Sequence, residues 1–167
     1  SLLAAVGGSE GPALVRAFVA ATDDTLTALD YLIANANELN LDTDRIVLKG
    51  GSAGAITALT VAYCTDKFGI DRPPIAAVID LSGVLTSSCD RGAVIGSGEP
   101  MLFVAHGTED GGDTAFSNAV SIIDAAIAAE ITYEFHPLED VSHVWDEWEE
   151  TTADGRCNVS REGRAGP

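Results

Sequence analysis

Short apolar runs alternate along the chain with longer segments in which apolar residues recur every three or four positions. The short runs predict strands, which lie at 45–49, 75–81, 101–105 and 131–135. The longer segments predict helices, which lie at 13–37, 55–66 and 114–129. Strands that alternate with helices favour crossover connections and a parallel sheet. The pattern therefore predicts an α/β fold, with a mostly parallel sheet and flanking helices.

The pattern is less regular in the first helical segment and at the C-terminal end. Thr22-Asp23-Asp24 offers a second N-cap inside the first segment, so one helix and two helices with a break near 21–23 are equally good interpretations. Val144–Glu150 is expected to form a short helix. From Thr151 the sequence is polar and holds three glycines, so 151–167 is expected to be a mobile tail after a domain at 1–150.

The turn after the first strand reads Gly50-Gly51-Ser52-Ala53-Gly54, a G-x-S-x-G pattern. Between a strand and a helix, this pattern is typical of a sharp turn that lifts a nucleophilic serine above the sheet, with small neighbours that let the helix pack close behind. The N–H of Ala53 is then expected to stabilise an oxyanion on a Ser52 adduct. A phosphate-binding turn fits less well, because there is no G-x-G-x-x-G and Lys49 precedes the glycines.

The loops after the third and fourth strands offer partners for Ser52. An acid in the loop after the third strand would orient a histidine, and Asp110 is preferred there over Glu109 and Asp113. His143 lies in the loop after the fourth strand, where a general base can reach the serine.

The other two histidines are expected to have structural roles. His136 lies at the edge of the fourth strand, and His106 is expected to order the acid loop through hydrogen bonds.

The charge and cysteine content limit the classes of partner. The 167 residues include 26 acidic and 9 basic ones, for a net charge of −17, so nucleic acid and anionic membranes would be repelled. No apolar stretch approaches the roughly 20 residues of a membrane span. Three cysteines without a C-x-x-C spacing make a zinc site improbable and leave one disulfide and free thiols equally open. A cytoplasmic and a secreted location therefore both stay open.

These motifs together resemble the α/β-hydrolase superfamily, and within it the bacterial carboxylesterase/lipase-like branch. The order serine, acid, histidine is that of this fold. The resemblance covers about residues 22–146 and is carried by five stretches: Asp24-x5-Asp30-Tyr31-Leu32 with Asn35-Ala36, Asn40–Ile46, Gly50–Ala55, His106-Gly107-Thr108-x-Asp110 and Val141-Ser142-His143.

The resemblance implies a serine esterase with Ser52 as nucleophile, His143 as base, Asp110 as acid and no cofactor or metal. The family usually has a glycine before its histidine, where this chain has Val141-Ser142. It also has strands before the nucleophile strand, where a His-Gly-Gly-Gly loop often supplies a second oxyanion donor, and no such loop precedes Arg45 here. The chain is therefore expected to be a C-terminal portion of the domain, with low activity by itself.

The expected substrates are small or soluble esters. The segment 82–100, where large lids usually enter this fold, is short and has little apolar bulk. Trp145 and Trp148 follow the histidine at helical spacing and either wall the substrate pocket or pack the last helix onto the sheet. The alternatives are a serine exopeptidase, a non-catalytic hydrolase-fold module and a nucleotide-binding α/β protein. The oligomeric state stays undetermined.

Overall fold

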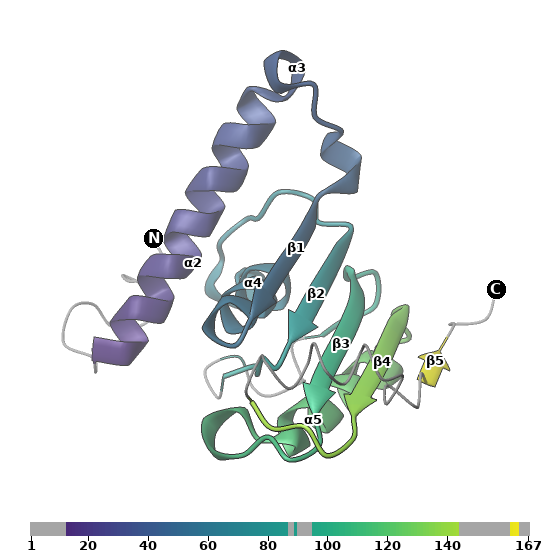
Figure 1. The fold of residues 1–167 in the computed structure, drawn as a ribbon. Coiled ribbons are helices and arrows are strands. Elements are labelled where there is room, and N and C mark those ends of the chain that lie inside the picture. The colour runs from purple at the N-terminus through teal and green to yellow at the C-terminus, as the bar shows by residue number, and fades with distance from the viewer. Residues whose placement is uncertain (1–12, 87–88, 90–94, 144–160, 164–167) are drawn as a thin grey trace.

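The computed structural model describes residues 13–86, 89, 95–143 and 161–163 (Figure 1). Its helices are α2 (Ala13–Ala34), α3 (Ala36–Leu39), α4 (Ala53–Tyr63) and α5 (Phe116–Ala128). Its strands are β1 (Val47–Gly51), β2 (Ala77–Leu81), β3 (Met101–Gly107), β4 (Tyr133–Leu138) and β5 (Arg161–Gly163). The expected helix at 144–150, with Trp145 and Trp148, lies outside the described residues.

The strands form one sheet in the order β1-β2-β3-β4-β5. The pairs β1–β2, β2–β3 and β3–β4 are parallel, which confirms the predicted α/β class with a mostly parallel sheet. β5 pairs with β4 in the antiparallel direction and falls in the segment expected to be a tail, where the sequence does not predict a strand. The division into 1–150 and 151–167 stays a prediction.

α2 is one continuous helix, so the interpretation with a break near 21–23 is wrong. The hydroxyls of Thr22 and Thr25 donate to the carbonyls of Phe18 and Ala21, four residues back, at 2.9 and 2.7 Å. Bonds of this kind satisfy the polar side chain inside the helix, so the threonine does not compete as a cap.

Two strands are displaced from their predicted positions. The first begins at Val47, because Thr43–Arg45 forms a 3-10 turn whose Asp44 N–H donates to the Asp42 carboxylate at 3.1 Å. The fourth extends through Pro137 to Leu138, so His136 lies within β4 and not at its edge. A proline fits at this position because parallel pairing leaves alternate residues without a ladder bond.

The main core lies between one face of the sheet and the helices α2, α4 and α5. Its fully buried members include Leu59 and Val61 of α4, Val78 of β2 and Val104 of β3. A smaller cluster, Ala105, Leu138 and Val141, lies on the other face. Figure 1 shows α4 and α5 behind the sheet, with α2 alongside β1.

A disulfide joins Cys64, at the end of α4, to Cys89, in the loop after β2. It settles the alternatives left open by the cysteine count in favour of one bridge among the described residues. Both cysteines are buried in the main core, so the bridge fixes the C-terminal end of α4 to the loop that follows β2. Cys157 lies outside the described residues.

Candidate active site

Ser52 occupies the strained position of a strand-to-helix turn. It lies between β1 and α4 with φ 50° and ψ −119°, in the left-handed half of φ space that residues other than glycine rarely adopt. Its N–H donates to the carbonyl of Leu81 at 2.9 Å, and its carbonyl accepts from the N–H of Ile56 at 3.0 Å. The backbone on both sides of the serine is therefore fixed, to β2 on one side and within α4 on the other.

The requirement for a small residue in this turn falls on Gly50. A Cβ there would lie 2.1 Å from the carbonyl carbon of Gly54 and 2.4 Å from the N of Ala55, well inside contact distance. A Cβ on Gly54 itself would meet nothing within 4 Å. The motif predicts that small residues are needed on both sides of Ser52. Among the described residues, the close approach requires one at Gly50 but not at Gly54.

The structure brings Ser52, His143 and Asp110 together in one chain of hydrogen bonds. His143 Nε2 lies 2.8 Å from Ser52 Oγ, and His143 Nδ1 lies 2.7 Å from Asp110 Oδ2. Because the carboxylate only accepts, Nδ1 carries the proton and Nε2 accepts from the serine hydroxyl. The Asp110 side chain is 1% exposed and that of His143 is 38% exposed, so the acid is buried while the imidazole faces the site.

Asp110 is held by two further side chains. Thr114 Oγ1 donates to Asp110 Oδ1 at 3.0 Å and lies 3.2 Å from His143 Nδ1. His106 Nε2 lies 2.7 Å from the Thr114 carbonyl and 3.1 Å from Asp110 Oδ2. Since the carbonyl only accepts, His106 carries its proton on Nε2, and burial lowers the pKa of this fully buried ring. His106 therefore orders the acid loop, as predicted.

The two alternative acids lie away from this network. Glu109 and Asp113 are exposed, and His143 Nδ1 contacts Thr114 and Asp110 instead of either of them. Thr114 was missed by the sequence argument, because a threonine in a polar loop carries no signal of its own.

The acid loop and the histidine loop are also joined through their backbones. The N–H groups of Thr108 and Glu109 donate to the carbonyls of Leu138 and Val141 at 3.0 and 2.9 Å. The N–H of Asp140 donates to Thr108 Oγ1 at 3.0 Å. A Cβ on Gly107 would lie 2.2 Å from the Val141 carbonyl oxygen, so the close approach of the loops depends on that glycine.

Ala53 is the first residue of α4 and is exposed. The first four N–H groups of an α-helix have no acceptor within the helix, so the Ala53 N–H is available to a group bound on Ser52. Its role as an oxyanion donor stays a prediction.

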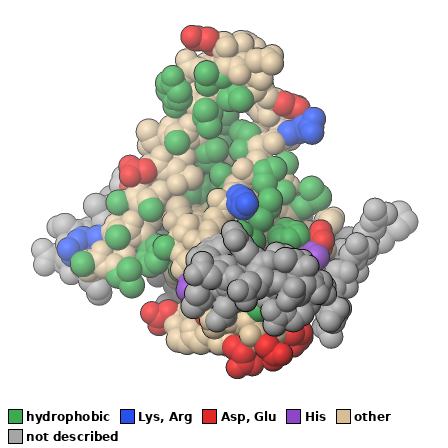
Figure 2. Space-filling view, viewed as in Figure 1, with side chains coloured by type: hydrophobic (Ala, Val, Ile, Leu, Met, Phe, Trp, Pro, Cys, Tyr) green, Lys and Arg blue, Asp and Glu red, His purple; other side chains and the backbone are tan. Residues whose placement is uncertain are grey.

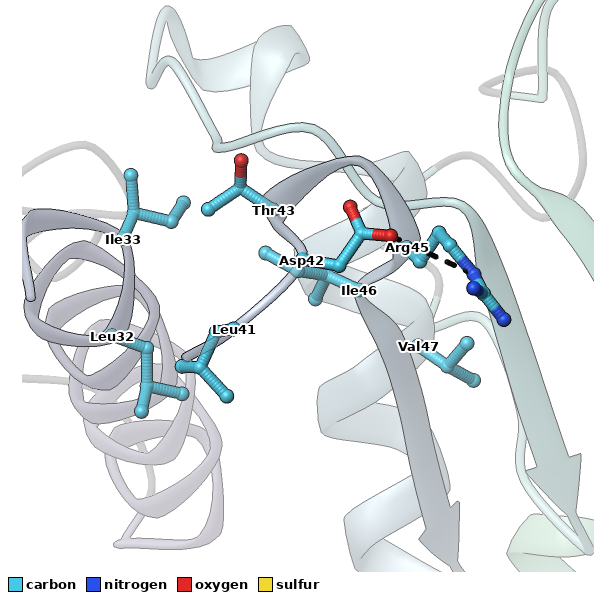
Figure 3. Close-up of a pocket in the computed structure, with 8 residues that line it drawn as sticks. All are labelled: Leu32, Ile33, Leu41, Asp42, Thr43, Arg45, Ile46 and Val47. Atoms are coloured by element: carbon cyan, nitrogen blue, oxygen red, sulfur yellow. Dashed lines mark ion pairs between the residues drawn. The ribbon is translucent and has the colours of Figure 1, made fainter. Parts of the chain in front are cut away.

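Two hollows flank the sheet. One, of about 610 Å³, lies between α2, α4 and the loops after β2 and β3, and Ile56 and Ala115 are among its lining residues. The other, of about 390 Å³, is a groove between the end of α2 and the start of β1 (Figure 3). Leu32, Leu41 and Val47 line this groove.

Within the described residues, no cluster of three or more His, Cys, Asp or Glu could hold a metal ion. No helix in the same part of the chain is long and apolar enough to cross a membrane.

One protein family matches part of the chain. The profile of the BD-FAE family matches residues 13–87, which include the serine turn but end before the acid and the histidine. No curated protein matches the chain.

Solved esterase structures have the same fold. The carboxylesterase Cest-2923 from Lactobacillus plantarum WCFS1 is 17% identical with a TM-score of 0.62, over 73% of this chain and 54% of its own. The propionate-bound esterase Est2 from Thermogutta terrifontis is 22% identical with a TM-score of 0.65, over 80% of this chain and 62% of its own. A truncated carbohydrate esterase from gut microbiota is 14% identical with a TM-score of 0.59, over 83% of this chain and 68% of its own.

The chain spans little more than half the length of the first of these enzymes and about three fifths of the second. The likeness therefore concerns 73 to 83% of this chain and only part of each of those enzymes. Over that part, the chain has the α/β-hydrolase fold of these esterases.

Proposed function

We propose that this chain carries the nucleophile, base and acid of a serine esterase. The observation that supports this most strongly is the hydrogen-bond chain from Ser52 Oγ through His143 to Asp110, with links of 2.8 and 2.7 Å. The three groups come from loops after three different strands, yet they meet at the carboxyl edge of the sheet, where ligands of such sheets bind.

The proposed reaction is acyl transfer through Ser52. Its Oγ attacks the ester carbonyl while His143 Nε2 takes the hydroxyl proton, and the same proton then passes to the leaving alcohol. Water, deprotonated by His143, attacks the acyl-enzyme, and Ser52 regains its proton as the carboxylic acid leaves. Asp110 keeps the imidazole in the right tautomer and stabilises its cation, and the Ala53 N–H stabilises the oxyanion.

The second oxyanion donor is proposed to lie outside the described residues. Loss of one such donor typically lowers turnover by about 10² to 10³. With the Ala53 N–H as the one proposed donor among the described residues, ester hydrolysis should be slow, while a covalent adduct should still form on Ser52.

The proposed substrates are small or soluble carboxylic esters. Two solved structures of the Thermogutta esterase hold propionate and butyrate, and two others are phosphorylated by paraoxon and phosphonylated by cyclosarin. An organophosphorus probe and a short-chain ester are accordingly the right reagents for this chain.

The test is labelling with a fluorophosphonate, followed by peptide mapping, together with hydrolysis of p-nitrophenyl acetate. Label on Ser52, and loss of both label and hydrolysis in Ser52→Ala, would support the esterase. Ser121→Ala is a matched control, because Ser121 is an exposed serine of α5 whose hydroxyl bonds only to the Ser117 carbonyl. Equal hydrolysis by wild type and Ser52→Ala would overturn the proposal, and faster cleavage of an amide substrate would favour a peptidase.

A further inference from the structure

A buried carboxyl group that the proposed reaction does not use lies directly behind the serine turn. Asp80 is the fourth residue of β2 and is fully buried. Its register partner on β1 is Gly50, and the next residue, Leu81, accepts the N–H of Ser52. Asp80 thus lies beside the strand end from which the serine turn starts.

The turn at Gly83 lies between the Asp80 carboxyl and the first turn of α4. The Oδ1 of Asp80 accepts from the N–H of Gly83 at 2.7 Å, which closes a turn through Ser82, a residue with φ 55°. A Cβ on Gly83 would lie 2.4 Å from that Oδ1 and 2.6 Å from the Cβ of Ala55. The carboxyl therefore supports the helix start through Gly83, where there is no room for a side chain.

Among the described residues, no cation offsets the charge of this carboxyl. Tyr63 is the titratable residue of α4, and burial raises its pKa. His106 lies two residues beyond Val104, the partner of Asp80 on β3, and burial lowers its pKa. Lys49 of β1 pairs with Ile79, so alternation along the strand places it on the opposite face.

The neutral form of Asp80 is favoured by these surroundings. Its Oδ2 has no hydrogen-bond partner among the described residues, and burial raises the pKa of Asp80 to about 7. Ionisation would place an uncompensated negative charge under the helix start whose Ala53 N–H is to stabilise an oxyanion. Two negative charges on either side of one helix terminus oppose each other, so the transition state would lose stabilisation.

We propose that Asp80 is a positioning residue that supports the serine turn in its protonated form, and that its ionisation sets an alkaline limit on acylation of Ser52. The inference rests on the proposed esterase function. Acylation of Ser52 should therefore slow on the alkaline side as Asp80 loses its proton.

The test compares wild type with Asp80→Asn and Asp80→Ala in fluorophosphonate labelling rate and in kcat/KM across about pH 6 to 9. Asparagine keeps an oxygen acceptor for the Gly83 N–H and cannot ionise, whereas alanine removes the acceptor. Asp124→Asn is the control for loss of one charge, because Asp124 is exposed on α5. Circular dichroism at each pH would verify that every variant compared is folded.

Wild type and Asp124→Asn should lose rate at alkaline pH by up to about tenfold per pH unit, whereas Asp80→Asn keeps its rate. Asp80→Ala should acylate at least about tenfold more slowly than Asp80→Asn at every pH, because the turn loses its support. An alkaline fall that persists in Asp80→Asn would overturn the inference, as would equal rates for the two variants. Absence of label on wild-type Ser52 at every pH would instead overturn the esterase function on which the inference depends.

Discussion

Two regions of the sheet differ in which side chains they bury: the carboxyl ends of the strands, and the outer edge formed by β1. At the carboxyl end, the side chains of Asp110 and His106 are buried, and each is hydrogen-bonded within the loops after β3 and β4. At the β1 edge, apolar side chains are exposed instead: Val47 is 49% exposed, Leu41 45% and Tyr31 62%. Figure 2 shows hydrophobic side chains gathered over α2 and β1.

The first region holds the groups of the proposed reaction, whereas the second exposes apolar surface on which another protein surface can pack. At the carboxyl ends of the strands, Ser52, His143 and Asp110 are hydrogen-bonded to one another, which favours a site with fixed geometry. β1 is the last strand of the described sheet on its side and has an apolar groove of about 390 Å³ beside it. An open sheet edge with apolar neighbours is a place for further pairing. Substitutions at the carboxyl ends of the strands should therefore alter catalysis, and substitutions at the β1 edge should alter association.

The largest expected effect is on the acid of the site. Asp110→Asn should lower kcat by about 10⁴, or about 5.5 kcal/mol, because an amide pairs with the wrong tautomer of His143. Asp113→Asn, three residues away and exposed, should change kcat less than about threefold. Steady-state kinetics on p-nitrophenyl acetate measures both. A larger loss in Asp113→Asn would assign the acid role to that residue.

A smaller effect is expected from the disulfide that ties α4 to the loop after β2. Cys64 and Cys89 are 25 residues apart, and the chain-entropy model gives about 3.5 kcal/mol for closing a loop of this size. Reduction should lower the urea midpoint of unfolding accordingly, as followed by circular dichroism. The double variant Cys64→Ala/Cys89→Ala should already show the lower midpoint and should not respond to the reductant. A response of that variant would assign the effect to another group.

The junction between the acid and histidine loops should be the next most sensitive part. Gly107→Ala forces a Cβ to within 2.2 Å of the Val141 carbonyl oxygen, and overpacking of this kind typically costs about 1 to 3 kcal/mol. Gly111→Ala is the matched control, since a Cβ there meets nothing within 4 Å. Thermal unfolding should separate the two variants. Equal melting temperatures would mean that the loops adjust to the added methyl group.

The smallest effect on stability is expected at the β1 edge. Val47→Thr replaces a half-exposed side chain and should change the free energy of unfolding by less than about 0.5 kcal/mol. Self-association at high protein concentration should nevertheless fall, because the edge loses apolar surface. Sedimentation in about 0.5 M salt, which screens the net charge of −17, tests this. Unchanged association would move the associating surface away from β1.

The sequence predicts the elements and the strand-end loops well because apolar periodicity reports burial directly. The buried strand at Ala77–Leu81 follows from that pattern, whereas the turn at Ser52 follows from the G-x-S-x-G motif between a strand and a helix. It fails where local bonds override periodicity, as at Asp42, which delays the start of β1, and at the threonines of α2, which bond within the helix.

Contacts between side chains that are distant in the sequence cannot be predicted from one sequence alone. Thr114 contacts Asp110 through a loop whose shape depends on His106, and Asp80 is significant only because Gly50 and Gly83 bring α4 onto it. Nothing in the residue types alone distinguishes Asp80 from the other acids of this acidic chain. Its importance follows from full burial, which the alternation in β2 predicts for the position but not for a carboxyl group.

The backbone bonds between the loops after β3 and β4 also bear on how such a site can change over generations. Thr108, Glu109 and Val141 make these contacts largely through N–H and carbonyl groups, which most substitutions leave in place. The residues around the acid and the histidine can therefore drift in type while their spacing persists. The segment from β3 to His143 is therefore one structural unit. Recombination could transfer it intact to a sheet with a different serine turn.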